Sequence, residues 1–258
     1  MSAAITIKSS EEIQLMQQAN QIVAEALNLI QREIKPGLST KYLDSLAETF
    51  ARENESIPAF KGYRGYPASL CVSINEQVVH GIPSEKVIIK DGDIVSVDFG
   101  VSYKGYFGDA AITIPMGSVD NKRLKLLRVT REALTLGIEQ VREGNRVSDV
   151  SLAIQRHVEK NNFYVVKQFV GHGIGTHFHE SPEVPKYKRS GRSPRLLPGM
   201  VIAIEPMVNT GTSEVRVLSD GWTVVTNDRK DSAHFEHSVV VTDKDPLILS
   251  GAILEQKI

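Results

Sequence analysis

The sequence of 258 residues predicts an α+β fold. Two segments with helical periodicity come first, a group of β-rich runs follows, and this order of helices and strands then repeats. No linker rich in proline, glycine or serine separates the two groups. We therefore expect one domain over residues 1–258, built from two similar halves at about 36–120 and 121–250, rather than two independent domains.

Four segments have the apolar spacing and the end signals of helices. The first, at about 10–35, begins after a serine cap with two acids and stops at a Lys-Pro-Gly sequence. The others are expected at Thr40–Glu53, at about Asp120–Arg142 and at Val147–Lys160. Strands are expected in two groups, at 69–74, 78–82, 94–103 and 106–114 and then at 163–170, 200–208, 222–227 and 234–242.

The composition is that of an ordinary globular protein. Hydrophobic residues make up 41% of the chain, and 30 basic residues nearly balance 31 acidic ones, so no overall charge indicates a nucleic-acid or membrane partner. Cys71 is the only cysteine, which excludes an intramolecular disulfide and favours a reducing compartment. We expect neither a secretory signal nor a membrane-spanning run of about 20 apolar residues. A cytoplasmic protein is predicted.

Two aspartates lie within β-rich segments that a short turn joins. Asp98 and Asp109 are equidistant from the point between residues 103 and 104. A hairpin turning there brings them opposite each other, with Cβ atoms about 4.5–5.5 Å apart. Opposed like charges are unfavourable unless a positive charge lies between them. From this pair alone, a cation site and ordinary strand-end carboxylates in water both stay open.

Two glutamates repeat the pattern in the second half of the chain. Glu205 and Glu236 are equidistant from Asp220-Gly221, a dipeptide typical of hairpin turns, and Pro206 favours an extended backbone at Glu205. A bulge in the long arms could shift this register by one residue. Four acids inside apolar strands need several positive charges close by. Two divalent cations supply that charge, and nothing else in these strands does.

The stretch GHGIGTHFHE, residues 171–180, has three histidines between glycines. Neutral imidazole is a common metal ligand, and glycines allow the backbone to approach a metal closely. The spacing fits neither nucleotide-binding fingerprint, and no second histidine follows His179-Glu180 as it would in a zincin helix. We therefore interpret the stretch as a metal-binding loop that supplies a fifth ligand.

Five short motifs, in the same order and at matching intervals over nearly the whole chain, resemble those of type I methionine aminopeptidases. They are VVHGIP with His80, VDFGVSYKGYFGD with Asp98 and Asp109, GHGIGTHFHE with His172 and His179, IEP with Glu205, and FEHSVVVT with Glu236. The resemblance implies the pita-bread (creatinase/aminopeptidase-like) fold, in which two pseudo-symmetric halves form an antiparallel sheet covered by helices. It also implies metal-dependent removal of the initiator methionine from nascent polypeptides, with a preference for a small second residue.

The same resemblance implies five metal ligands for two divalent ions, which could be Mn, Fe, Co or Zn. Asp98 would bind one ion, His172 and Glu205 would bind the other, and Asp109 and Glu236 would bind both. Two close divalent ions lower the pKa of a water between them, and the resulting bridging hydroxide would attack the peptide carbonyl after the first methionine.

Three residues resemble the catalytic groups of the family. Glu205 matches the general base, His179 the residue that stabilises the charge on the carbonyl oxygen, and His80 the residue that contacts the leaving nitrogen.

The methionine pocket of the family maps onto Phe60, Tyr63, Tyr66, Cys71, Phe178 and Trp222. Each of these aromatic residues could also be an ordinary core residue. The Cys71 thiol fits a small buried hydrophobe better than a nucleophile.

Other polar residues receive weaker interpretations. His234 and His237 flank Glu236, and we expect both to point to the opposite face of the strand. Asn75 matches a family position where the backbone binds a monovalent cation. The basic run at 186–195 is interpreted as a solvated loop or as a contact with ribosomal RNA.

Two other function classes stay open. A non-enzymatic binding protein could keep the fold, although such proteins usually lose metal ligands and this chain has all five. A proline-directed peptidase shares the ligands but carries a further N-terminal domain, whereas about 70 residues precede the first strand here. The 26 positions from His179 to Glu205 are too few for the helical subdomain of type II methionine aminopeptidases. We expect a monomer that acts on peptides or nascent chains, without DNA or membrane partners.

Overall fold

Four α-helices lie in the segments where the apolar spacing predicts them. A computed structural model describes residues 4–254, and its helices are α1 Ser10–Glu33, α2 Thr40–Glu53, α3 Asn121–Ile138 and α4 Val147–Lys160. Ser9 caps α1: its hydroxyl accepts from the Glu12 N–H, and the Glu12 carboxylate accepts from the Ser9 N–H. A short 3-10 helix, η1, spans Tyr63–Gly65. None of the helices among these residues is both long and apolar enough to cross a membrane.

Antiparallel strands form one large sheet and two small ones. In residues 4–254 the large sheet has the order β1-β4-β5-β14-β9-β7-β8, with β2 on β4 and β15 on β14. The small sheets have the orders β13-β10-β6 and β11-β12-β3. The strands are β1 Ile57–Pro58, β2 Cys71–Ile74, β3 Gln77–Val79, β4 Ile94–Tyr103, β5 Tyr106–Pro115, β6 Tyr164–Val165, β7 Gly171–Gly173, β8 Glu180–Val184, β9 Val201–Ile204, β10 Met207–Asn209, β11 Val215–Val217, β12 Val224–Thr226, β13 Ser232–His234, β14 Glu236–Val240 and β15 Leu247–Ile248.

Several strands differ from their predicted limits. The expected strand at 200–208 is broken into β9 and β10 at Glu205-Pro206, where proline offers no N–H to a neighbouring strand. Its partner is broken opposite this point, at Phe235, into β13 and β14. The region expected to be a metal-binding loop is partly strand, because 171–173 form β7 and β8 begins at Glu180. The division into two equivalent halves stays a prediction.

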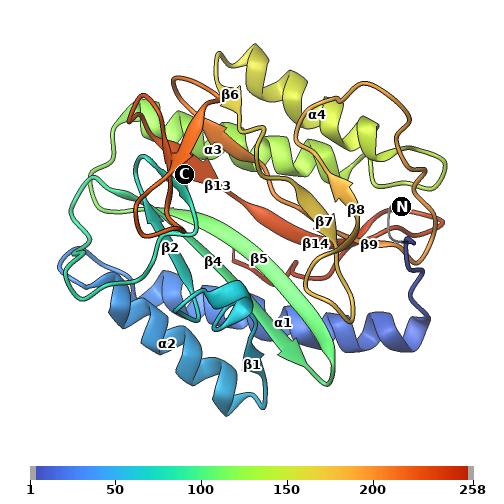
Figure 1. Ribbon diagram of the computed structural model, residues 1–258, viewed down its shortest axis with the longest axis horizontal. Helices are drawn as coiled ribbons and strands as arrows, with labels where there is room; N and C mark the ends of the chain where they lie inside the picture. Colours follow the sequence, from blue (N-terminus) through green and yellow to red (C-terminus); the bar gives the residue numbers. More distant parts are fainter. Residues whose placement is uncertain (1–3, 255–258) are drawn as a thin grey trace.

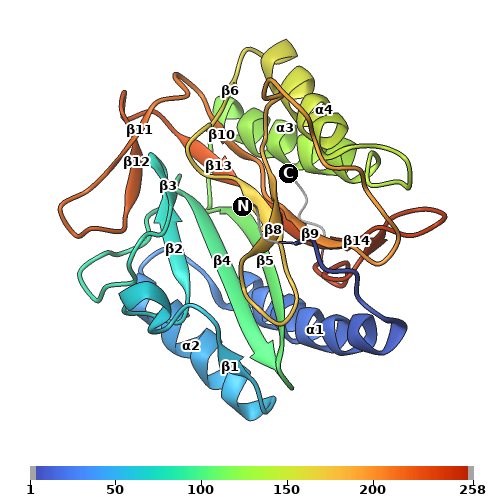
Figure 2. The same cartoon turned by 45° about the vertical axis from the view of Figure 1, so that its right-hand side comes forward.

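The helices cover one face of the large sheet (Figures 1 and 2). α1 packs on β4 and β5 beside α2, whereas α3 packs on β9, β13 and β14 beside α4. Alternate strand residues such as Val97, Phe99 and Val239 join the helices in the main core. Side chains alternate between the two faces of a strand, so Asp98 points to the face opposite to its neighbours Val97 and Phe99. The functional site is built on that second face.

Candidate metal centre

Asp98 and Asp109 lie on one face of the β4–β5 hairpin, but not directly opposite each other. The turn is centred one residue later than predicted, on Lys104–Gly105, so Asp98 pairs with Ala111 and Asp109 pairs with Gly100. The predicted direct opposition is therefore wrong. Because the resulting offset is two residues, which is the period of a strand, both carboxylates still point to the same side.

Glu205 and Glu236 occupy the positions that the predicted register assigns to them. The pairs on either side, between β9 and β14 and between β10 and β13, keep this register without a bulge, so the two glutamates lie across from each other. Glu236 also pairs with Ala111, the residue on β5 that pairs with Asp98. Three acids therefore lie in one row across the sheet, and Asp109 lies two residues along from it.

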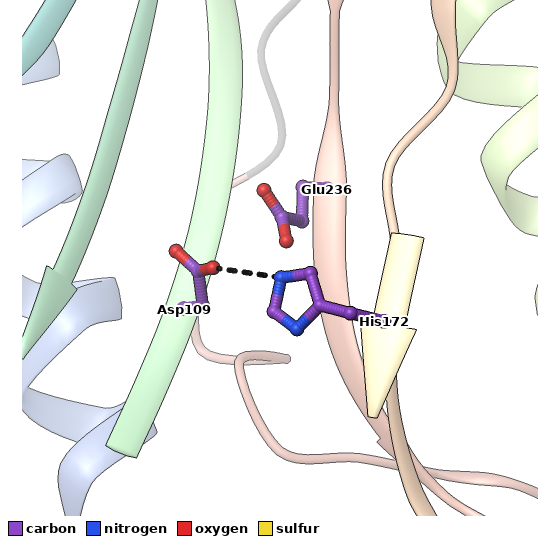
Figure 3. A group of neighbouring side chains, drawn as sticks. All are labelled: Asp109, His172 and Glu236. Carbon is purple, nitrogen blue, oxygen red and sulfur yellow. Dashed lines mark ion pairs between the residues drawn. The ribbon is translucent and has the colours of Figure 1, made fainter. Parts of the chain in front are cut away.

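His172 on β7 completes the cluster from the other side (Figure 3). Its Nδ1 lies 2.9 Å from the Gly173 carbonyl oxygen, and a hydrogen bond donated there leaves Nε2 as the atom that faces the acids. That Nε2 lies 3.7 Å from Asp109 Oδ2 and 3.9 Å from Glu205 Oε1. A Cβ atom at Gly173 would lie 2.2 Å from the Ser181 carbonyl oxygen, so glycine is required beside the histidine.

The burial of these acids gives the cluster unusual electrostatics. Asp109 and Glu236 are each 3% exposed and Glu205 is 9% exposed. Burial, with the neighbouring carboxylates adding to it, raises the pKa values of Asp98 and Glu236 well above their ordinary range. Burial also raises the pKa of Asp109 to about 6, although His172 acts in the opposite direction. The charged forms therefore need positive charge from outside the cluster.

The donor set fits divalent metal ions. Ligand atoms of Asp109, His172 and Glu236 all lie within 4.8 Å of one another (Figure 3). Buried oxygens of Asp98, Asp109 and Glu236 have no hydrogen-bond partner within the described residues. Oxygens of this kind are satisfied by a cation rather than by a further acceptor. Carboxylates with one imidazole suit Mn, Fe, Co or Zn, and the geometry does not select among them.

Two basic side chains, His234 and Lys186, lie next to the glutamates of the cluster. Both were expected elsewhere from the sequence. His234 is 2% exposed, and its Nε2 lies 3.7 Å from Glu236 Oε2. The expectation that His234 points away from Glu236 is wrong, because residues two apart on a strand share a face; only His237 lies on the other side. The side chain of Lys186, expected in a solvated basic loop, is 1% exposed, and its Nζ lies 3.6 Å from Glu205 Oε2. Strand periodicity could have located His234, but no local signal predicts the burial of Lys186.

An aromatic cavity of about 260 Å³ opens above the acids. Phe60 and Phe178 meet edge to face with ring centroids 5.4 Å apart, and Tyr66 meets Trp222 in the same way at 5.1 Å. Cys71 lies beside Asp98 in the β2–β4 pairing, and burial raises the pKa of its thiol well above the usual range, which disfavours the reactive thiolate. The cavity is lined by every predicted ligand, catalytic and pocket residue and also by Arg64, Val79, Phe169, Val170, Met207 and His234.

His80 and His179 stand at the same cavity as neutral bases. His179 Nδ1 lies 2.8 Å from the Tyr63 hydroxyl, and its ring lies 4.3 Å from that of His172. Partial burial, reinforced by the charge of His172, lowers the pKa of His179 to about 4. Burial also lowers the pKa of His80, against the opposing effect of Glu205. Both lowered pKa values favour the neutral imidazole, which can donate one hydrogen bond and accept another.

Comparison with known proteins identifies the family. The family model "Metallopeptidase family M24" matches residues 14–243. A methionine aminopeptidase of Clostridium acetobutylicum is 50% identical over 246 residues, which are 95% of this chain and 98% of that protein. The chain belongs to metallopeptidase family M24.

Within family M24, the chain is similar to methionine aminopeptidases over nearly its whole length. "Methionine aminopeptidase 1" of Bacillus subtilis is 48% identical and covers 93% of this chain and 96% of its own. The solved structure of a methionine aminopeptidase from Thermotoga maritima superimposes with a TM-score of 0.94 at 44% identity, covering 96% of this chain and 99% of that one. The resemblance in the motifs is thereby confirmed, and the α+β architecture is the expected pita-bread fold.

Proposed function

We propose that this protein is a methionine aminopeptidase, a metal-dependent hydrolase that removes the initiator methionine from nascent polypeptides in the cytoplasm. The observation that carries the proposal is the convergence of four carboxylates and an imidazole at the base of an aromatic cavity. A buried cluster of this charge is suited to hold divalent ions, and the cavity above it has the apolar lining that a thioether side chain needs.

Asp98, Asp109, His172, Glu205 and Glu236 would hold two divalent ions. As the family resemblance implies, Asp98 would bind one ion, His172 and Glu205 would bind the other, and Asp109 and Glu236 would bind both. When bound, the ions supply Lewis acidity that polarises the peptide carbonyl and makes water more acidic. A site of mixed carboxylate and imidazole ligands accepts several divalent ions, so the bound metal would depend on the affinity of the site for each ion and on which ions the cell supplies.

Glu205 would move the proton of the reaction. Its carboxylate accepts a proton from the attacking water and passes it to the nitrogen of the scissile amide as the C–N bond breaks, which yields free methionine and a shortened peptide. His179, held neutral beside Tyr63, would donate a hydrogen bond to the carbonyl oxygen as negative charge develops on it. His80, which packs edge to face on Phe169, would contact the leaving nitrogen.

The aromatic cavity would select methionine as the first residue. Phe60, Tyr63, Tyr66, Cys71, Phe178 and Trp222 line it, and sulfur interacts favourably with aromatic ring edges. The acids close one end of this space, so the free amine of the first residue would lie at the metal centre. As the family resemblance implies, a small second residue would be preferred.

Peptide cleavage tests the proposal directly. The metal-free chain is supplied with Mn²⁺ and offered Met-Ala-Ser or Ala-Pro-Ala. Release of methionine from the first peptide, its loss after chelation, and no cleavage of the second are expected. Glu205→Gln should lower kcat at least about 10²-fold, while Glu214→Gln at an exposed position should leave it unchanged. Cleavage of Ala-Pro-Ala instead would indicate a proline-directed peptidase, and no cleavage of either peptide would favour a binding protein.

Two further parts of the proposal concern other contacts. Asn75 has a left-handed backbone with φ of 53°, and its carbonyl oxygen accepts the Ser232 N–H at 2.9 Å, so a monovalent cation would share that oxygen. The remaining basic residues at 188–195 would contact ribosomal RNA, and the chain would act as a monomer. Co-sedimentation with ribosomes that is unchanged after neutralising these residues would contradict the RNA contact.

A further inference from the structure

Lys186 places a buried amine directly behind one of the proposed metal ligands. It follows Pro185 at the end of β8, and its side chain is 1% exposed. Its Nζ donates a hydrogen bond to the Phe169 carbonyl oxygen at 2.8 Å and lies 3.6 Å from Glu205 Oε2. Lys186 does not line the aromatic cavity, so it faces the carboxylate from the side away from a substrate.

The two oxygens of Glu205 therefore face different partners. Oε2 lies beside Lys186, whereas Oε1 lies 3.9 Å from His172 Nε2 and points into the acid cluster. Burial lowers the pKa of Lys186, but Glu205 and Glu236 favour its charged form. An ammonium group in this place also offsets part of the negative charge that four carboxylates bring together.

We propose that Lys186 is a positioning residue for Glu205, and that its positive charge weakens the binding of divalent ions at this centre. The inference rests on the proposed metal site. By attracting Oε2 across 3.6 Å, Lys186 leaves Oε1 as the atom that would face the ions and the attacking water. The same positive charge repels a divalent ion, which should lower the affinity for the ion by at least about tenfold. Lys186 thus fixes the orientation of Glu205 and at the same time lowers the affinity of the site for divalent ions.

Substitution of Lys186 by methionine separates these effects. Lys186→Met keeps most of the apolar stem of the side chain but removes the ammonium group, its charge and its hydrogen bond to the Phe169 carbonyl oxygen. Titration calorimetry of the metal-free full chain with Mn²⁺ should show binding about tenfold tighter than in the original protein. With saturating Mn²⁺ and a Met-Ala-Ser substrate, kcat should fall at least about tenfold while KM stays within about twofold, because only the orientation of Glu205 is lost.

Matched variants control the test. Lys244→Met removes an exposed lysine that does not line the cavity and should change neither quantity. Lys186→Arg keeps the charge and should restore the original Mn²⁺ affinity. If Lys186→Met does not fold, Lys186→Gln provides the second neutral variant. Unchanged or weaker Mn²⁺ binding in the neutral variants would overturn the inference. If the original protein cleaves no methionyl peptide, the proposed function fails, but the Mn²⁺ titration still tests whether the charge of Lys186 weakens ion binding.

Discussion

At the scale of single residues, the acid cluster should couple protons to the proposed metal binding. Burial raises the pKa of Asp109 to about 6, and the pKa values of Asp98 and Glu236 are raised as well. A carboxyl group whose pKa is raised on folding stabilises the protein below its unfolded pKa, and this contribution is lost as the pH rises through the folded pKa. Divalent ions bind the deprotonated form, so they restore stability on the alkaline side.

The stabilisation by Mn²⁺ should therefore grow between pH 5 and pH 7.5. We expect a small increase in Tm on adding Mn²⁺ at pH 5 and a larger one at pH 7.5, with protons released on binding in calorimetric titrations. Burial lowers the pKa of His237 to about 4, so its titration also contributes to the pH dependence of Tm. Comparing samples with and without Mn²⁺ at each pH removes this contribution. An equal Tm increase at both pH values would contradict the coupling.

His179 and His177 offer a matched pair for testing stabilisation of the carbonyl oxygen. His179 lies in the cavity beside Tyr63, whereas the His177 side chain is 82% exposed. Loss of one preorganised hydrogen-bond donor in such a site lowers kcat by about 10²–10³. We expect this fall for His179→Ala, with little change for His177→Ala and unchanged Mn²⁺ affinity in both. Similar kcat values for the two variants would assign His179 no part in the reaction.

At the scale of elements, helix α2 anchors the loop that carries three pocket aromatics. The Asp44 carboxylate accepts from the backbone N–H groups of Ser69 and Leu70. Glu48 accepts from Lys61 Nζ at 2.8 Å and from the Ser69 hydroxyl at 2.8 Å. These bonds attach both ends of the segment 60–70 to one helix, so the position of the pocket depends on α2 as well as on the loop itself.

Glu48→Gln should loosen this segment and weaken methionine binding. Hydrogen bonds from Lys61 and then Arg52 lower the pKa of Glu48 to about 2, so the stabilisation is present above pH 4.5 and is lost as the pH falls toward 2. At pH 7 we expect a loss of about 1 kcal/mol in unfolding free energy and a several-fold higher KM. Glu53→Gln, exposed at the end of the same helix, is the control. Equal KM values in the two variants would show that methionine binding does not depend on the hydrogen bonds between Glu48 on α2 and the pocket segment.

At the scale of the whole molecule, the parts that could be predicted are those with local signals. Helices α2 and α4 follow apolar spacing and have their predicted limits. The long hairpin that pairs Glu205 with Glu236 keeps its register because no bulge interrupts either arm. The β4–β5 turn lies one residue later than predicted. The prediction used the positions of the two aspartates, but the turn is set by the residues that form it, Lys104 and Gly105.

The unpredicted parts of the site depend on contacts between distant segments. β7 has two glycines in three residues and hence no alternation to indicate a strand; it exists because Gly173 pairs with Ile202 on β9. Lys186 is buried because β8 carries the following segment behind Glu205, which a basic run does not reveal. The family motifs mark five ligand positions that do line one cavity, but the charged surroundings of these residues could be found only in the folded chain.

The proposed ligands connect strands that lie far apart in the sequence. Asp98 and Asp109 belong to β4 and β5, which pack on α1, whereas Glu236 and His172 belong to β14 and β7 beyond them. Divalent ions would therefore join both parts of the sheet. With Mn²⁺ at about 100 times its Kd, mass action adds about 2.7 kcal/mol to the unfolding free energy, or about 5–10 °C in Tm for a chain of this length.

Hydrogen exchange can show whether this stabilisation spans the sheet. Mn²⁺ should slow amide exchange in the β4–β5 hairpin and in β9 and β14 together, because unfolding either part would break the shared coordination. The exposed segment at 188–192 should exchange at the same rate with and without Mn²⁺. Glu236→Gln, which removes a proposed shared ligand, should abolish protection on both sides. Protection confined to one hairpin would mean that the ions bind that part alone and do not link the two.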